Sequence, residues 1–181
     1  DINVDYFKVP DDEIVPFLSN QHRFQDKINR YYAQQSISRT ELVYSARYQF
    51  DAPKNKRRTF NLPIQNIDAL SSPGIYLAVM TQPSDVTHSI SMTHFTVTDI
   101  GMHVRVYKGQ LEVALNSLDD QKPLSGIVVS LLDKKGKQID QFKSSPDGLG
   151  TLKTKSDARY IVAHSDSSLS VVKLTGPALD L

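Results

Sequence analysis

The C-terminal half of the chain alternates apolar and polar residues in short runs that end at Gly, Pro, Asp or Ser. Leu111, Val113 and Leu115 occupy alternate positions, as a strand with one buried and one hydrated face requires. Turn signals recur about every ten residues, the spacing of an antiparallel sandwich. The pattern predicts seven strands: Met102–Tyr107, Leu111–Leu118, Ile127–Asp133, Lys137–Lys143, Thr151–Lys155, Tyr160–His164 and Leu169–Leu174.

Two glycine turns separate three of these strands. Asp133-Lys-Lys-Gly136 and Ser145-Pro-Asp-Gly148 each end in a glycine, which tolerates the positive φ that tight turns require. Turns this close leave no room for a helix, so the stretch from Ser125 to Leu152 is predicted to be a pair of hairpins without a reactive group.

The N-terminal half is less regular. Its apolar runs predict five strands, and residues 11–35 carry apolar side chains at helical spacing, which predicts a helical insertion that Pro16 divides into two. Five strands are few for a sandwich, so part of this domain is expected to precede Asp1. The predicted strands are Ile2–Val9, Glu41–Phe50, Arg58–Ile64, Gly74–Thr81 and His88–Thr98.

The two patterns predict an all-β protein of two tandem antiparallel β-sandwich domains, residues 1–98 and 99–181, with a short helical insertion in the first. The join at Thr98–Gly101 has no Pro-rich or Ser-rich linker. We therefore expect the two domains to be joined end to end, with little change in their relative orientation.

Composition excludes several functions. The 21 basic residues balance 20 acidic ones, and each half is balanced separately, so no field recruits nucleic acid or an anionic membrane. The chain has no cysteine, which excludes disulfides and thiolate chemistry. No apolar run approaches the roughly 20 residues that span a bilayer, so any membrane attachment would lie outside these residues.

No motif predicts catalysis, a cofactor or a metal site. Ser170 and Lys173 have the Ser-x-x-Lys spacing of some acyl enzymes, but on a strand this spacing places them on opposite faces. Asp119-Asp120 lacks the alternating oxygen ligands of a calcium loop and is predicted to be a hydrated turn. The five histidines lack metal-ligand spacing and are interpreted as structural: His22, His88, His94, His103 and His164.

One charge cluster and three aromatic features remain as candidate surfaces. The cluster is a predicted hairpin tip that could also dock an acidic partner; it comprises Lys54, Lys56, Arg57 and Arg58. Tyr6-Phe7 and Tyr31-Tyr32 are interpreted as core or domain-interface residues. Pro73-Gly-Ile-Tyr76 predicts a turn into a buried strand whose tyrosine hydroxyl bonds back to the backbone.

Several stretches in this order resemble a known family. They are "INVDYFKVPDDEIVPFL", "PGIYLAVM", "FTVTDIGMHVRVYKGQLEVALNSLDDQKPLSGIVVSLLDKKGKQI", "SPDGLGTL" and "PALDL". Together they are similar to consecutive macroglobulin-like domains, of immunoglobulin or fibronectin III type, in the N-terminal half of bacterial alpha-2-macroglobulins. The resemblance covers nearly the whole chain.

The resemblance implies a scaffold segment of a secreted or lipid-anchored periplasmic protein. Family members are protease traps in which cleavage of a bait region rearranges the molecule, and one branch adds a thioester between a cysteine and a glutamine. The chain has no cysteine and no identifiable bait region, so the resemblance implies neither a thioester nor a bait region within this chain. Its sequence most resembles the branch without a thioester. Implied partners are neighbouring macroglobulin domains, proteases met by the full-length protein and other cell-envelope proteins.

Two alternatives stay open. An adhesin-like or carbohydrate-binding module would be indicated by an exposed aromatic platform or an apolar groove. An accessory domain of a hydrolase would be indicated by a catalytic domain further along the gene.

Overall fold

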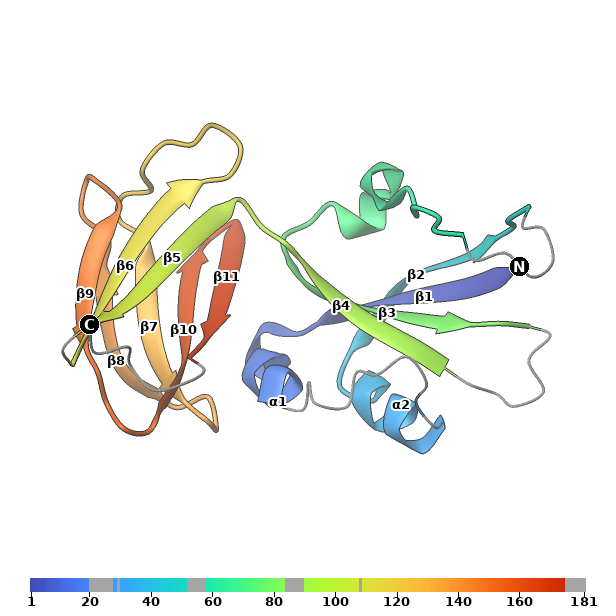
Figure 1. Ribbon diagram of the computed structural model, residues 1–181, viewed down its shortest axis with the longest axis horizontal. Coiled ribbons are helices and arrows are strands. Elements are labelled where there is room, and N and C mark those ends of the chain that lie inside the picture. Colours follow the sequence, from blue (N-terminus) through green and yellow to red (C-terminus); the bar gives the residue numbers. More distant parts are fainter. Residues whose placement is uncertain (20–27, 29, 52–57, 84–89, 108, 175–181) are drawn as a thin grey trace. The chain divides into compact units, whose positions relative to one another are not determined.

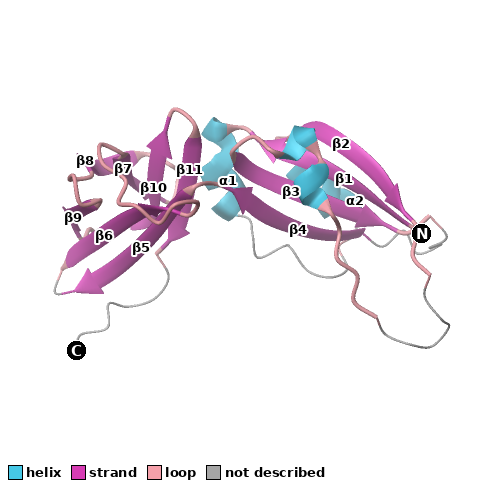
Figure 2. Ribbon diagram, turned by 90° about the horizontal axis from the view of Figure 1, so that it is seen from above, coloured by secondary structure: helices cyan, strands magenta, loops and turns pink. Residues whose placement is uncertain are grey.

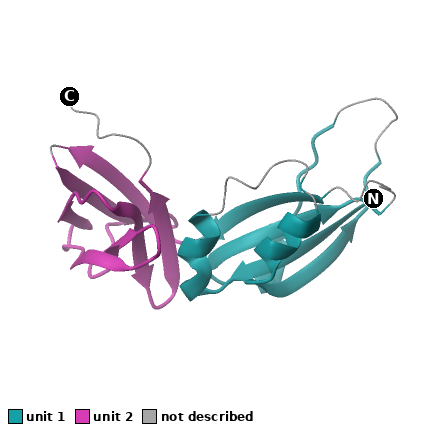
Figure 3. Ribbon diagram, turned by 90° about the horizontal axis from the view of Figure 1, so that it is seen from below, with its two compact units in different colours: residues 1–97 teal, residues 98–181 magenta. Residues whose placement is uncertain are grey.

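The computed structural model describes residues 1–19, 28, 30–51, 58–83, 90–107 and 109–174. The chain divides into two compact units, Asp1–Val97 and Thr98–Leu181 (Figure 3). No helix in the described residues is long and apolar enough to cross a membrane.

The described strands of unit 1 form one antiparallel sheet in the order β2-β1-β3-β4. Their bounds are Ile2–Val9 for β1, Glu41–Tyr48 for β2, Gly74–Thr81 for β3 and Ile90–Val97 for β4. The first six residues of β3 are all buried. This strand is central and covered on both faces, which explains why its sequence is apolar without alternation.

The predicted helical insertion is confirmed in its described parts. The 3-10 turn η1 spans Asp11–Glu13, α1 spans Ile14–Ser19 and α2 spans Arg30–Ile37. The predicted break at Pro16 is wrong, because Pro16 lies inside α1. A proline is tolerated there since the first backbone N–H groups of a helix have no intrahelical partner.

One predicted strand is absent. Residues 58–63 form no strand, and two 3-10 turns follow, η3 at Ile64–Asn66 and η4 at Asp68–Leu70. Figure 1 shows these turns on one side of the sheet and α1 and α2 on the other. The alternation of Phe60, Leu62 and Ile64 therefore serves a covering layer: Leu62 and Ile64 pack on the core of the sheet, which includes Val4, Tyr6, Leu70, Tyr76 and Ala78.

Unit 2 is a sandwich of two antiparallel sheets, with strand orders β5-β6-β9 and β11-β10-β7-β8 (Figures 1 and 2). All seven predicted strands are confirmed. Side chains from both sheets share one core, in which Leu111, Leu131 and Ile161 are fully buried. The strands are β5 Ile100–Tyr107, β6 Gln110–Ser117, β7 Val128–Asp133, β8 Gln138–Lys143, β9 Leu149–Lys153, β10 Ala158–Ser165 and β11 Ser168–Lys173.

The fold class is thus all-β with a short helical insertion, as predicted. Unit 2 has the two facing sheets of a sandwich. Unit 1 has one sheet in the part described, with α1 and α2 on one side and the 3-10 turns on the other, so a second sheet is not among its described residues.

Candidate functional site

The predicted tyrosine corner is present in unit 1. Tyr76 is fully buried, and its hydroxyl donates a hydrogen bond to the backbone oxygen of Ser72 at 2.6 Å. The Ser72 hydroxyl lies 2.9 Å from the Tyr76 hydroxyl, and the Tyr76 ring stacks on Phe95 with centroids 5.4 Å apart. Lys8 places its ammonium 5.8 Å from the Tyr76 ring centroid, a cation–π arrangement. These contacts fix the turn before β3, which is a structural role.

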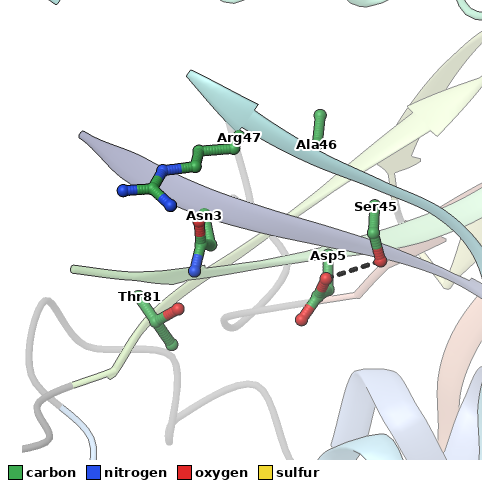
Figure 4. A pocket seen from close by; sticks show the side chains of 6 residues that line it. All are labelled: Asn3, Asp5, Ser45, Ala46, Arg47 and Thr81. Carbon is green, nitrogen blue, oxygen red and sulfur yellow. Dashed lines mark hydrogen bonds between the residues drawn. The ribbon is translucent and has the colours of Figure 1, made fainter. Parts of the chain in front are cut away.

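A polar hollow of about 340 Å³ lies on β1, β2 and the end of β3 (Figure 4). The Ser45 hydroxyl donates to Asp5 at 2.7 Å, and Arg47 forms a 2.7 Å ion pair with Asp1. Asn3 and Thr81 complete the lining with Ala46. Both charged groups of the lining have partners within the protein, Asp5 in Ser45 and Arg47 in Asp1, so their arrangement is accounted for by contacts that stabilise the sheet.

The predicted docking cluster falls mostly outside the described residues. Lys54, Lys56 and Arg57 belong to residues 52–57, of which the structure gives no account. Arg58 is described and exposed, at the start of the stretch that leads to η3. Docking of an acidic partner on these four residues stays a prediction.

Ser170 and Lys173 lie on β11, where Ser170 pairs with Ala163 and Lys173 with Tyr160. Three positions apart on a strand, they face opposite sides, as the sequence predicted. A lysine in this position cannot deprotonate the serine, so the acyl-enzyme arrangement is absent from this pair.

The Asp119-Asp120 pair forms a turn, as predicted. Asp120 accepts hydrogen bonds from the ammonium of Lys122 at 2.6 Å and from its backbone N–H at 3.1 Å, and these bonds lower the pKa of the Asp120 carboxyl. Both carboxylates are on an exposed turn. In the part of the chain that the structure describes, no group of three or more His, Asp and Glu residues could hold a metal ion.

The three histidines that the structure describes lie on different strands and do not converge. His103 and His164 are exposed on β5 and β10, and His22 and His88 lie outside the described residues. His94 is half-buried on β4, with its ring 6.2 Å from that of Phe17 on α1 in an edge-to-face arrangement. Burial lowers the pKa of His94 below its usual value of 6.5.

This lowered pKa predicts an acid sensitivity of unit 1. Below the ordinary histidine pKa the unfolded chain binds the proton more readily than the folded chain, so the free energy of unfolding falls as the pH falls through about 6.5. We expect His94→Gln to lose less stability than the wild type between about pH 7.5 and pH 5. Urea unfolding at both pH values measures this difference. An equal loss in both proteins would contradict it, and His164→Gln is the exposed control.

The two aromatic pairs differ in their burial. Tyr6 and Phe7 are buried, as predicted, and burial together with the 3.2 Å hydrogen bond to the Tyr48 hydroxyl raises the pKa of Tyr6. Placement of Tyr31 and Tyr32 in the core is wrong: they are 69% and 44% exposed on α2. Their rings contact each other edge to face at 5.6 Å. Helical spacing identified the helix but not its face.

Three aromatic rings stack on one another in unit 1. Phe50 lies between Tyr48 and Phe60, with centroids 6.3 and 4.4 Å away. Phe60 is 40% exposed. Phe50 stacks with a ring on each side, so this stack differs from the open platform expected of a carbohydrate-binding module.

Sequence reasoning missed a hydrogen-bonded cluster at the start of unit 2, formed by Thr98, Asp99, Ser117 and Ser168. Ser117 and Ser168 are both buried. No local signal could have revealed this cluster, since Ser168 is 70 positions from Thr98 and reaches it only through the sandwich topology.

Comparison with known proteins assigns both units. The domain described as "Bacterial alpha-2 macroglobulin MG2 domain" matches residues 1–95, and "Bacterial alpha-2-macroglobulin MG3 domain" matches residues 97–181. The chain is 31% identical to an alpha-2-macroglobulin of Escherichia coli over 99% of its length and 30% identical to one of Xylella fastidiosa over its full length. It spans only 11% and 12% of these relatives.

Solved structures agree. A crystal structure of native Escherichia coli alpha-2-macroglobulin spanning domains NIE-MG1 has a TM-score of 0.85 at 28% identity, with 96% of this chain and 83% of that one covered. The trypsin-activated protein from the same organism has a TM-score of 0.79 at 30% identity, with 99% of this chain and 12% of that one covered. The chain therefore belongs to the bacterial alpha-2-macroglobulin family, in which it corresponds to two consecutive MG domains.

Proposed function

We propose that the chain is a non-catalytic scaffold segment of a periplasmic, broad-spectrum protease inhibitor of the alpha-2-macroglobulin type. The observation that carries the proposal is the match of both units, in order, to consecutive MG domains of these proteins. In this role the chain supplies two rigid domains that hold neighbouring MG domains in place. It is the full-length protein that interacts with proteases.

The internal chemistry supports a structural role. The polar groups that sequence reasoning raised as catalytic candidates are separated on the strand, as Ser170 and Lys173 are, or form exposed turns, as Asp119 and Asp120 do. Hydrogen-bonded polar clusters instead connect turns to strands, through Tyr76 and Ser72 in unit 1 and through Ser168 in unit 2. Such bonds give rigidity and leave no group activated for reaction.

The proposal predicts trapping by the full-length parent protein. Trypsin is the first protease to mix with it, because a relative is described as trypsin activated. We expect cleavage in one exposed region, followed by loss of tryptic activity on a large protein substrate while a small peptide substrate is still cut. Band shifts and the two activities measure this. Trypsin with its active site blocked is the control, and unchanged activity on both substrates would contradict the inhibitor function.

The contribution of this segment can be separated from trapping itself. Gly148→Ala in the full-length protein should weaken shielding of the large substrate, because the substitution is expected to lower the free energy of unfolding of unit 2 by about 4 kcal/mol and so to raise the unfolded fraction of that unit. Gly126→Ala is the matched control. Trapping that survives the loss of unit 2 would show that the parent is an inhibitor and that this segment is not part of its necessary frame.

A further inference from the structure

Thr98 and Asp99 connect the last paired strand of unit 1 to the first paired strand of unit 2, and hydrogen bonds within unit 2 hold both residues. Val97 ends β4 and pairs with Gly74 in the sheet of unit 1. Ile100 begins β5 and pairs with Ser117 in unit 2. Only Thr98 and Asp99 lie between these two paired residues, so their conformation decides how many backbone torsions can vary at the join.

Ser168 secures the first side of this connection. Its hydroxyl lies 2.9 Å from that of Thr98 and accepts the backbone N–H of Asp99 at 3.0 Å. The Thr98 hydroxyl in turn accepts the backbone N–H of Ile100 at 3.0 Å. Ser168 is 8% exposed, and breaking its bonds would leave buried polar atoms without partners.

Asp99 secures the other side. Its carboxylate accepts the Ser117 hydroxyl and the backbone N–H of Asp119, both at 2.9 Å. Its backbone oxygen accepts the N–H of Leu118 at 2.8 Å. Hydrogen bonds to a carboxylate are stronger than those between neutral groups. Strand β11 and the end of β6 thus hold Thr98 and Asp99 from two separate elements.

We infer that Thr98 and Asp99 move rigidly with unit 2, and that any reorientation of the two units is confined to the torsions on either side of the Val97–Thr98 peptide, ψ of Val97 and φ of Thr98. The join is therefore a single pivot and not a four-residue linker. Val97 is fixed on one side by its pairing in unit 1, and the torsions beyond φ of Thr98 are fixed by the Ser168 and Asp99 bonds. The inference is independent of the proposed function.

The absence of cysteine allows a direct test in the chain of 181 residues. Thr93→Cys on β4 and Glu112→Cys on β6 place one spin label on an exposed strand position of each unit. Electron–electron double resonance then gives the distribution of distances between them. We expect Ser168→Ala to widen this distribution, because ψ of Thr98 and the torsions of Asp99 become free. Ser170→Ala, on the same strand but outside the cluster, should leave the width unchanged.

Hydrogen exchange gives a second readout. In the wild type the amide of Asp99 should be protected, and Ser168→Ala should accelerate its exchange about tenfold, the effect of losing one such hydrogen bond. Circular dichroism reveals whether Ser168→Ala unfolds unit 2. For that case Thr98→Val is the second variant, because it keeps the side-chain shape and removes the hydroxyl. We expect Thr98→Val to widen the distance distribution in the same way. Unchanged distance widths in both variants, or an unprotected Asp99 amide in the wild type, would overturn the inference.

Discussion

Gly148→Ala is expected to lower the free energy of unfolding of unit 2 by about 4 kcal/mol, the sum of a left-handed backbone cost and an overpacking cost. Gly148 has a φ of 73°, which disfavours any side chain. A methyl group built there would overlap the backbone oxygen of Leu115. That oxygen accepts the N–H of Leu124, and the N–H of Leu115 bonds to Gly148, so the carbonyl cannot move without breaking both contacts.

Gly126 provides the matched control. Its φ is 74°, nearly that of Gly148, but a methyl group there would meet no atom within 4 Å. Gly126→Ala should therefore cost only the backbone component, about 1 to 2 kcal/mol. Urea unfolding with hydrogen exchange resolved for each unit measures both variants. Equal losses would show that the clash at Leu115 is relieved by local movement.

Tyr76→Ala is expected to destabilise unit 1 by about 3 to 4 kcal/mol, in the range of large-to-small aromatic substitutions in cores. The ring is fully buried, stacks on Phe95 and carries the hydroxyl that bonds the backbone of Ser72. Its loss leaves a cavity in the core of the sheet and frees the turn before β3.

Tyr76→Phe separates the contribution of the buried ring from that of the hydroxyl hydrogen bond. It keeps the ring and removes the bond to Ser72, so we expect a loss of about 1 kcal/mol. Tyr31→Ala, at an exposed tyrosine of the same unit, should change stability by no more than about 0.5 kcal/mol. Unfolding curves in urea check all three variants. A loss for Tyr76→Ala no larger than that for Tyr31→Ala would contradict the structural importance of the corner.

Two predictions for unit 1 were wrong where tertiary packing decides the outcome. Residues 58–64 have the alternation of a strand, yet they lie over the sheet without pairing, since Pro63 lacks a backbone donor and the apolar side chains have a core to cover. Alternation of apolar and polar residues indicates that one side of a segment is buried, but it does not indicate that the segment pairs with a neighbouring strand. Likewise, the spacing of Tyr31 and Tyr32 predicted a helix whose face toward the sheet depends on packing.

The sequence by itself determined the local features: the seven strands of unit 2, the glycine at the Ser145–Gly148 turn, and the tyrosine that bonds back four residues to Ser72. Each depends on residues that are neighbours along the chain, where backbone torsions and the period of two act directly. Tertiary structure alone decided which strands share a sheet, that Gly148 lies against Leu115, and that Ser168 holds Thr98 and Asp99. These contacts join residues tens of positions apart, and the periodicity of a strand specifies its buried face but not its partner.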